Sequence, residues 1–312
     1  MRAVKWIGWA AIVLVVASLV LASGAYAYDR QQTANVMREF APRGEYVDVD
    51  GARMHVICRG AGEPTLVLQA GIAGGALDWL PLMDELAADH RVCAFDRLGQ
   101  DWSDPAPTPR TLGTAADELA VALADLGISR PVIVGHSLGS VIAQINAARY
   151  PVAGVVLVDG LTLDAVGPVT QRLGSYQRLD LAARVGLLRP LAGLFVDGAY
   201  APELRRELQA LRGQSHVLLG VSAEGALAAQ TAATELAAAE PRIDVPVLLI
   251  AAGANELPEA ALFTQAQHDF AARHPDATLV TVPGASHYVI ASHAPDVAML
   301  MQTWLDDLVI TN

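Results

Sequence analysis

The hydrophobic pattern divides the chain into an apolar N-terminal run and a longer region in which short strands alternate with helices. Strands are predicted at residues 45–49, 52–58, 65–69, 91–95, 132–134, 154–158, 246–251 and 278–282. Segments with helical spacing separate them at 80–88, 112–126, 138–149 and 295–308. Because most of these strands are apolar throughout and alternate with helices, the pattern predicts an α/β fold with a mostly parallel sheet sandwiched by helices.

The pattern changes between residues 160 and 242, where Leu- and Ala-rich helices broken by Gly and Pro replace the strands. This stretch is expected to be a helical insertion at one edge of the sheet. The sequence thus predicts a core formed by residues 44–159 and 243–312, with 160–242 as a helical cap over it.

The N-terminal segment has the pattern of a targeting or membrane segment rather than of a part of the folded domain. Residues 6–28 carry no charge, and Arg2 and Lys5 precede them. A run of this length spans a bilayer, and the positive-inside rule places the remainder of the chain outside the cytoplasm. Residues 1–28 are therefore expected to be a membrane anchor, or a cleaved signal peptide ending at the A-x-A sequence of residues 25–27, which would make the protein secreted. Residues 29–43 are expected to form a polar tether.

Composition narrows the function classes. Hydrophobic residues make up 53% of the 312 residues and charged residues 17%, against about 25% in an average soluble protein, so a large buried core is expected. The net charge of -12 excludes a nucleic-acid-binding surface of the usual basic kind. Two cysteines are too few for a disulfide-rich scaffold or a zinc module.

The clearest chemical signal is the pentapeptide GHSLG at residues 135–139, which matches G-x-S-x-G. It follows an apolar strand and opens a helix, which is the context of a nucleophile elbow. The sharp turn exposes the hydroxyl of Ser137, and the helix N-terminus behind it favours developing negative charge. Ser137 is the candidate nucleophile.

A serine nucleophile needs a base, and eight histidines are available. His287 directly follows the last predicted strand, so it can meet Ser137 at the carboxyl edge of the sheet. His293 lies six residues further on and is the weaker candidate, and His136 is expected to point away from the serine. The other histidines have surface or core contexts: His55, His90, His216, His268 and His274.

The base needs an orienting acid, which should fall between Ser137 and His287 in the chain. Two carboxylates follow strands in this interval. Glu256 follows the strand at 246–251 and is the preferred candidate, while Asp159 ends the strand at 154–158 and is the alternative. The oxyanion requires two backbone N–H donors. Leu138, next to the nucleophile, supplies one, and Ile72 in the Gly-rich loop at 70–75 is the candidate for the other.

The order of these features resembles the α/β-hydrolase superfamily: a strand, a Gly-rich loop, the GHSLG elbow, a helical insertion, an acid-bearing loop and a late histidine. The stretches FDRLG at 95–99 and PGASH at 283–287 are similar to its cap-bearing members, in which Asp96 and Arg97 are usually structural. The resemblance implies eight strands with the second antiparallel, and a cap that shapes the substrate pocket. It also implies the roles assigned above to Ser137, His287, Ile72 and Leu138.

The sequence departs from the family pattern in four places. Ala70 stands where the oxyanion loop usually has His, and Ser140 where a further Gly usually follows the elbow. The Gly-x-Gly-x-Ser stretch reads GQDWS at 99–103, and the acid after the late strand is Glu256, where Asp is commoner. The last departure makes the triad acid the weakest assignment.

These features predict a serine hydrolase that acts on a small carboxylic ester through an acyl-enzyme, without metal or cofactor. Epoxide hydrolysis and dehalogenation on this fold use an Asp nucleophile, which Ser137 does not match. A C–C hydrolase or acyltransferase with the same triad is the alternative within enzymes. A catalytically silent ligand-binding protein is the alternative outside them. The membrane is an expected partner through the N-terminal helix, and the sequence indicates no oligomeric state.

Cys58 and Cys93 fall in the second and fourth predicted strands, 35 residues apart. The family resemblance implies that these strands are neighbours, so the two side chains either form a disulfide or fill the sheet as two small buried hydrophobes. Strand register decides between them.

Overall fold

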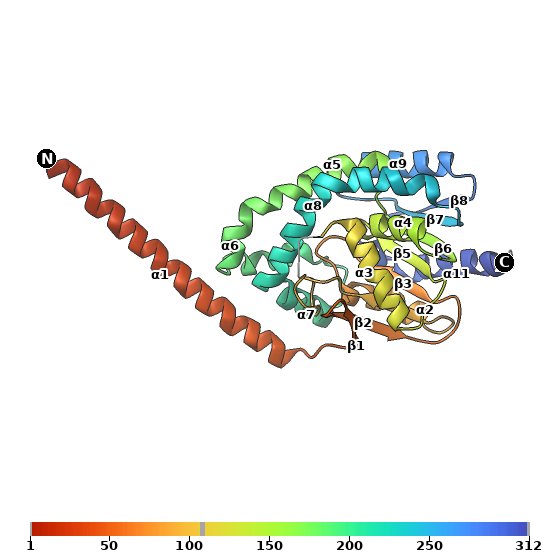
Figure 1. Ribbon diagram of the computed structural model, residues 1–312, viewed down its shortest axis with the longest axis horizontal. Helices are drawn as coiled ribbons and strands as arrows, with labels where there is room; N and C mark the ends of the chain where they lie inside the picture. Colours follow the sequence, from red (N-terminus) through yellow and green to blue (C-terminus); the bar gives the residue numbers. More distant parts are fainter. Residues whose placement is uncertain (1, 107–109, 311–312) are drawn as a thin grey trace.

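The computed structural model describes residues 2–106 and 110–310 and is built on an eight-stranded sheet (Figure 1). Its strands are β1 (Glu45–Val49), β2 (Ala52–Arg59), β3 (Leu66–Gln69), β4 (Val92–Phe95), β5 (Val132–His136), β6 (Gly154–Val158), β7 (Val247–Ala252) and β8 (Ala277–Val282). The order is β1-β2-β4-β3-β5-β6-β7-β8, with β2 antiparallel to both neighbours and the strands from β4 to β8 parallel. The predicted fold class is confirmed.

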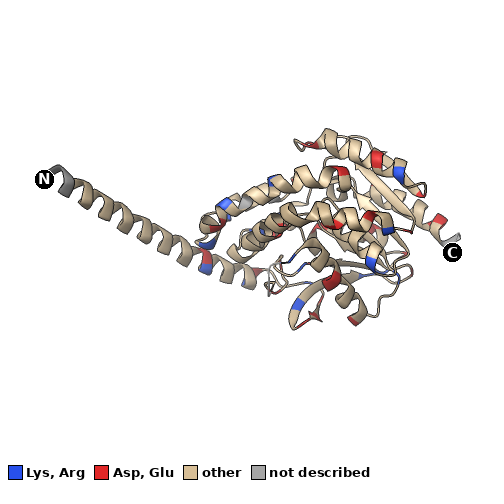
Figure 2. Cartoon of the chain, turned by 45° about the horizontal axis from the view of Figure 1, so that its top comes forward, with Lys and Arg blue, Asp and Glu red and all other residues tan. Residues whose placement is uncertain are grey.

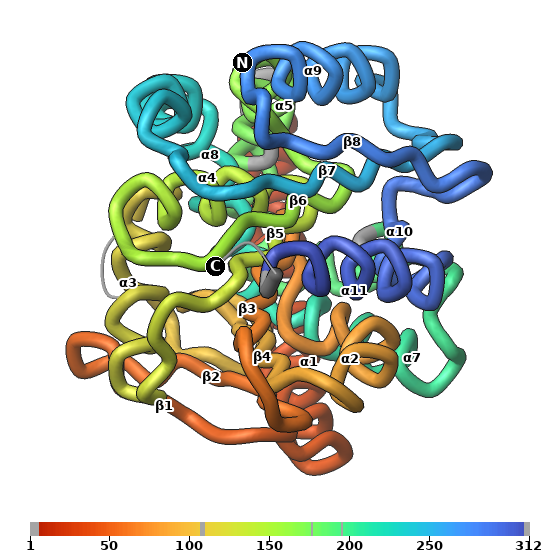
Figure 3. The backbone as a smooth tube through the Cα atoms, turned by 90° about the vertical axis from the view of Figure 1, so that its right-hand side faces the viewer, coloured from red at the N-terminus to blue at the C-terminus, as the bar shows by residue number. Residues whose placement is uncertain are grey.

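Helices cover both faces of the sheet (Figure 3). One face packs against α2 (Leu80–Leu86), the short α10 (Val289–Ser292) and α11 (Ala294–Ile310). The other packs against α3 (Leu112–Asp125), α4 (Gly139–Arg149) and α9 (Ala260–Arg273). The two faces divide β3 residue by residue, since Leu66 and Leu68 join the first core and Val67 the second. Two-sided burial explains why the inner strands are apolar throughout.

Helix α9 was not predicted from the sequence. Its buried residues are Phe263, Ala266, Gln267 and Phe270, which follow the helical spacing of i, i+3, i+4 and i+7. Apart from Leu262, small, polar and charged residues fill the rest of the helix, so the apolar pattern is sparse. The predicted strand at 246–251 begins and ends one residue later in the structure, at Val247 and Ala252.

Residues 160–242 contain helices and no strand, and the structure describes the backbone of all of them. The elements are α5 (Leu163–Gly174), η2 (Ser175–Leu179), α6 (Asp180–Arg184), η3 (Arg189–Phe195), α7 (Pro202–Arg212), α8 (Ser215–Ala239) and η4 (Glu240–Arg242). Helices α5 and α8 lie side by side, and α8 also packs on α4 and α3. This helical region is called the cap below.

The N-terminal segment forms one helix, α1 (Arg2–Glu39), which projects from the body of the molecule (Figure 1). Among the described residues, α1 is the helix whose length and composition suffice to cross a membrane, and its apolar window is exposed throughout. In Figure 2, where Lys, Arg, Asp and Glu are coloured, the projecting helix beyond its grey first turn is tan until it reaches the cap. The helix continues to Glu39, so residues 29–39 are not the tether that the sequence suggested.

The reason is that Asp29 and Val36, two turns apart on one face of α1, are buried against the folded domain. Arg189 of the cap donates from Nε to Asp29 Oδ1 at 2.9 Å, and Ser215 donates to Asp29 Oδ2 at 2.8 Å. Contacts with a distant part of the chain thus hold a polar stretch in the helix, which local composition alone does not reveal.

Cys58 and Cys93 lie directly opposite one another in the β2–β4 ladder, and the structure joins them in a disulfide. Their Cα atoms are 4.1 Å apart. The bridge fastens the antiparallel strand β2 to the parallel part of the sheet, and both sulfurs belong to strands rather than to mobile loops.

Candidate active site

Ser137 lies in the turn between β5 and α4, in a backbone conformation that few non-glycine residues adopt. Its φ is 50°, and its amide donates to Val158 O of β6 at 3.2 Å. A side chain on Gly139 would overlap the carbonyl of Gln69, so glycine is required where α4 starts against β3. The sequence therefore folds here into the strained turn that a nucleophile elbow needs.

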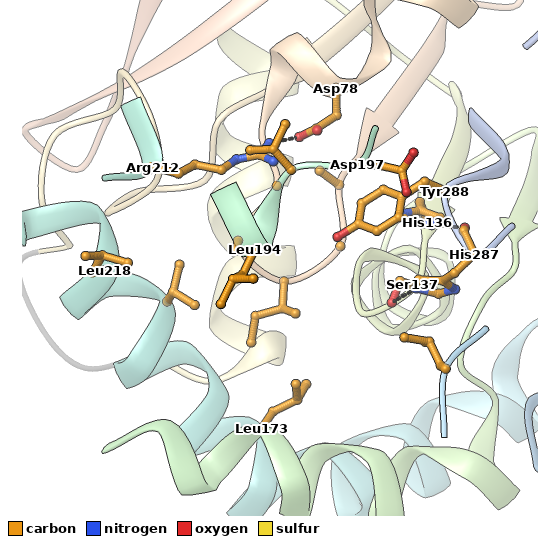
Figure 4. Close-up of a pocket in the computed structure, with 18 of the residues that line it drawn as sticks. Asp78, His136, Ser137, Leu173, Leu194, Asp197, Arg212, Leu218, His287 and Tyr288 are labelled. Atoms are coloured by element: carbon orange, nitrogen blue, oxygen red, sulfur yellow. Dashed lines mark hydrogen bonds and ion pairs between the residues drawn. The ribbon is translucent and has the colours of Figure 1, made fainter. Parts of the chain in front are cut away.

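His287 lies beyond β8, and its ring faces the serine. The distance from His287 Nε2 to Ser137 Oγ is 3.0 Å, which is hydrogen-bond length (Figure 4). Both side chains are buried, at 5% and 9% exposure, although the serine borders a cavity. The two residues come from positions 150 apart in the sequence and meet at the carboxyl edge of the sheet.

The acid on the other side of the ring is Asp159, the alternative candidate, and not Glu256. Asp159 Oδ2 lies 2.7 Å from His287 Nδ1. Glu256 instead accepts a hydrogen bond from the backbone N–H of His287 at 3.0 Å. The preferred sequence assignment of the orienting acid is thus corrected by the geometry.

The physical reason lies in how the two loops leave the sheet. Asp159 follows β6 without a spacer, and its φ of 38° turns the chain sharply so that the carboxylate stays at the sheet edge. Glu256 stands four residues beyond the end of β7, in an exposed loop. From there its carboxylate reaches the backbone of the His287 loop and not the ring.

Three further donors surround the buried Asp159 carboxylate. Ala252 N and Gln267 Nε2 donate to Oδ1 at 3.2 and 3.3 Å, and Asn255 Nδ2 donates to Oδ2 at 2.7 Å. A buried carboxylate is costly without such partners. These donors fix the position of the acid. The sequence analysis missed the side chains of Gln267 and Asn255 because they are amides in separate segments of the chain.

The two predicted oxyanion donors lie on either side of the nucleophile. Leu138 follows it at the start of α4, and the loop bearing Ile72 passes so close that a Cβ on Gly71 would stand 3.1 Å from Ser137 Cβ. Among the described residues, neither the Ile72 amide nor the Leu138 amide has a hydrogen-bond acceptor in the protein. Both N–H groups are therefore available to a ligand oxygen, and their role stays a prediction.

A buried arginine holds the oxyanion loop in place. Arg97 donates from Nη1 to Ala70 O at 2.7 Å and from Nη2 to Gly71 O at 2.9 Å. The Gly71 carbonyl and the Ile72 amide belong to the same planar trans peptide, so fixing one fixes the direction of the other. These two hydrogen bonds hold the loop although Ala70 stands where the family usually has His.

Arg97 is in turn paired with Glu224 of the cap helix α8. Its Nε and Nη2 lie 2.7 and 2.9 Å from the two carboxylate oxygens. Burial opposes both charges, yet mutual attraction lowers the pKa of Glu224 and raises that of Arg97. The pair links the cap to the oxyanion loop, a connection that the sequence pattern gave no signal for.

His136, expected to point away from the serine, supports the base. Its Nε2 lies 2.9 Å from His287 O, and the centroids of the two imidazole rings are 4.8 Å apart. Burial, together with the nearby His287, lowers the pKa of His136 to about 3. The ring is therefore neutral near pH 7, and its Nε2–H donates to the carbonyl of His287.

A cavity of about 650 Å³ lies between these residues and the cap (Figure 4). The cap contributes an apolar wall that includes Leu173, Leu188, Leu191, Leu194, Leu218 and Val221. A polar wall holds the buried Asp78–Arg212 ion pair and Tyr288, whose pKa burial raises to about 12. The cavity thus offers a largely apolar wall on its cap side and borders Ser137.

Residues 64–294 match the family model described as the alpha/beta hydrolase fold. That is well over half of the chain, so the chain belongs to the α/β hydrolase family. It is 28% identical over 258 residues to 2-(acetamidomethylene)succinate hydrolase of Mesorhizobium japonicum, covering 78% of this chain and 88% of that protein. It is 41% identical over 108 residues to RutD of Enterobacter cloacae, assigned as a carbamate hydrolase, but this covers only 33% of the chain and 41% of RutD.

Solved structures share the fold at lower identity. An esterase of Thermogutta terrifontis superposes with a TM-score of 0.68 at 21% identity, over 85% of this chain and 99% of the esterase. A protein described as a membrane phospholipase A and bacterial virulence factor superposes with a TM-score of 0.62 at 22% identity, over 99% of both chains. The second match therefore extends over α1 as well as the α/β domain.

Proposed function

We propose that this member of the α/β hydrolase family is a serine hydrolase of carboxylic esters that works through an acyl-enzyme. The observation that carries the proposal is the continuous set of hydrogen bonds from Ser137 through His287 to Asp159. A serine, an imidazole and a carboxylate in this order are the parts of a catalytic triad. The chemistry rests on geometry and not on the fold alone, since one fold hosts many reactions.

In the proposed mechanism His287 Nε2 takes the proton of Ser137 Oγ as the hydroxyl attacks the ester carbonyl. Asp159 holds the ring so that Nδ1 keeps its proton and stabilises the imidazolium that forms. The carbonyl oxygen becomes an oxyanion, which the amides of Ile72 and Leu138 receive. His287 then protonates the leaving alcohol, and water activated by the same ring releases the acid.

The substrate's acyl chain is proposed to lie along the leucines of the cap. The cavity of about 650 Å³ is lined by apolar side chains over most of the cap wall. Each buried methylene stabilises by about 0.8 kcal/mol, or about fourfold in kcat/KM where the contact forms. A series of p-nitrophenyl esters of rising acyl length should therefore show a rising kcat/KM from acetate to medium-chain esters, and a flat or falling series would contradict the assignment.

The α1 helix is proposed to remain attached and to anchor the enzyme with its catalytic domain outside the cytoplasm. The support is the apolar run preceded by Arg2 and Lys5, the docking of Asp29 on the cap, and a disulfide of the kind that persists outside the cytoplasm. The test is intact-mass analysis of protein extracted from membranes. A mass that includes residues 1–27 supports the anchor, whereas a chain starting near Tyr28 would show cleavage.

A further inference from the structure

Five exposed leucines cluster in the cap segment between α5 and α7. They are Leu179, Leu181, Leu187, Leu191 and Leu194, with exposed fractions of 48%, 76%, 57%, 48% and 79%. Large apolar side chains gathered on one short segment are unusual on a surface that faces only water. This set is called the leucine rim.

The rim lies at the mouth of the active-site cavity. Leu179, Leu191 and Leu194 line the cavity and are exposed at the same time, so they stand where it meets the outside. Leu181 and Leu187 are exposed without lining it. Anything entering the cavity past these residues crosses an apolar border.

The rim also lies beside the helix that has the length of a membrane span. Gly186 packs against Asp29 and Ala25 of α1, and Arg189 is hydrogen-bonded to Asp29. Figure 1 shows the α6 end of the cap alongside α1, and in Figure 2 the first coloured charged residues after the tan stretch of the projecting helix lie where the helix meets the rest of the chain. Residues 6–25 alone make a run of about 30 Å, so a bilayer spanned by this run would end beside the rim.

The charge of this segment differs from that of the whole chain. Residues 179–194 and the preceding Arg178 carry three arginines against one acid, Asp180, whereas the chain as a whole has a net charge of -12. Arg178 and Arg184 are exposed, and Asp180 accepts a hydrogen bond from Ser222. Exposed arginines next to exposed leucines suit the boundary between lipid headgroups and acyl chains.

We propose that the leucine rim inserts into the bilayer surface beside α1, so that the cavity opens into the lipid layer and takes its acyl substrate directly from it. The partner that the leucine rim contacts is thus a phospholipid bilayer. The assignment of the substrate as a membrane lipid ester rests on the proposed hydrolase function, whereas the insertion itself does not. Burying the five leucines in acyl chains removes the apolar border from water.

The insertion is tested on the full chain in vesicles of phosphatidylcholine and phosphatidylglycerol, without reference to activity. Cys58 and Cys93 are bonded to one another, so a thiol introduced by Leu181→Cys accepts a fluorophore alone. Met299→Cys is the matched control, because Met299 is 61% exposed on α11 at the far side of the molecule, and Val20→Cys in α1 reports the anchor. Quenching by doxyl-labelled lipid is expected at 181 and 20 and not at 299. A label at 181 quenched no more than the one at 299 would overturn the proposal.

A second arm tests delivery of the substrate. Leu181→Asp together with Leu187→Asp should lower hydrolysis of vesicle phospholipid by about tenfold or more, because charged groups resist insertion, and leave hydrolysis of a soluble short-chain ester unchanged. Met299→Asp should change neither. Equal losses on both substrates, or none, would contradict substrate entry from the bilayer. If the wild-type chain hydrolyses neither substrate while the label at 181 is quenched, the hydrolase proposal fails and the insertion stands.

Discussion

Asp159 Oδ2 lies 2.7 Å from Nδ1 of His287, although 128 residues separate them in the sequence. The contact decides which of two strand-end carboxylates orients the imidazole. Asp159 owes this position to the turn after β6, which places it next to β7 and to the loop after β8.

The first prediction separates the two carboxylates. Asp159→Asn should lower kcat by about 10⁴, the size of the effect when the orienting carboxylate of a serine protease becomes an amide. Glu256→Gln should cost less than about tenfold, since an amide oxygen still accepts the His287 N–H. Both are measured as kcat on one ester at equal folded fraction by circular dichroism. A crippled Glu256→Gln beside a near-normal Asp159→Asn would reverse the assignment.

The second prediction concerns the clamp on the oxyanion loop. Glu224→Gln should lower kcat by about tenfold with little change in KM, because Arg97 loses its charged partner and holds the Gly71–Ile72 peptide less firmly. Loss of a whole oxyanion donor costs about 10²–10³, so loosening one should cost less. Glu235→Gln is the control on the same cap helix, as Glu235 bonds Thr111 and the Gly113 amide and not the oxyanion loop. Equal effects of the two would show that only cap docking is disturbed.

The third prediction is a pH dependence of stability. The pKa of His136 falls from 6.5 to about 3 on folding, so the unfolded chain binds a proton that the folded chain refuses between these values. The free energy of unfolding therefore keeps its full value above pH 6.5. It decreases as pH falls from 6.5 toward 3, by up to about 1.4 kcal/mol per pH unit. Urea unfolding at pH 6.5 and 5 measures it, and His136→Gln should flatten the slope by that amount. Parallel slopes would show that His136 titrates alike in both states.

The fourth prediction concerns the bridge between β2 and β4. Denatured, unreduced protein should contain no free thiol by titration. Cys58→Ser with Cys93→Ser should lower the free energy of unfolding by roughly 3–4 kcal/mol, the loop-closure value for a separation of 35 residues. Two free thiols in the wild-type chain would reject the bridge.

The nucleophile and the base could be predicted from the sequence because each is marked by a short run of consecutive residues. Ser137 needs only a strand, two glycines and a helix, and His287 needs only to follow the last strand. The choice between Asp159 and Glu256 was not readable, because both follow strands that end at the same sheet edge. Only the left-handed turn at Asp159 and the length of the loop before Glu256 decide which one reaches the ring.

The remaining contacts depend on pairs of residues far apart in the chain. Arg97 meets Glu224 across 127 residues and Arg189 meets Asp29 across 160, and no local pattern announces either pair. The first gives the structural Arg97 a place next to the oxyanion loop. The second extends α1 through a polar stretch that reads as a tether.

The central claim is that Ser137 is an activated nucleophile, and labelling with a fluorophosphonate probe tests it most directly. The probe phosphonylates an activated serine, and peptide mass mapping then locates the modified residue. The wild-type chain should take one label per molecule, on Ser137, and folded Ser137→Ala protein should take none. A folded wild-type chain that stays unlabelled, or a label that persists in Ser137→Ala, would contradict the account.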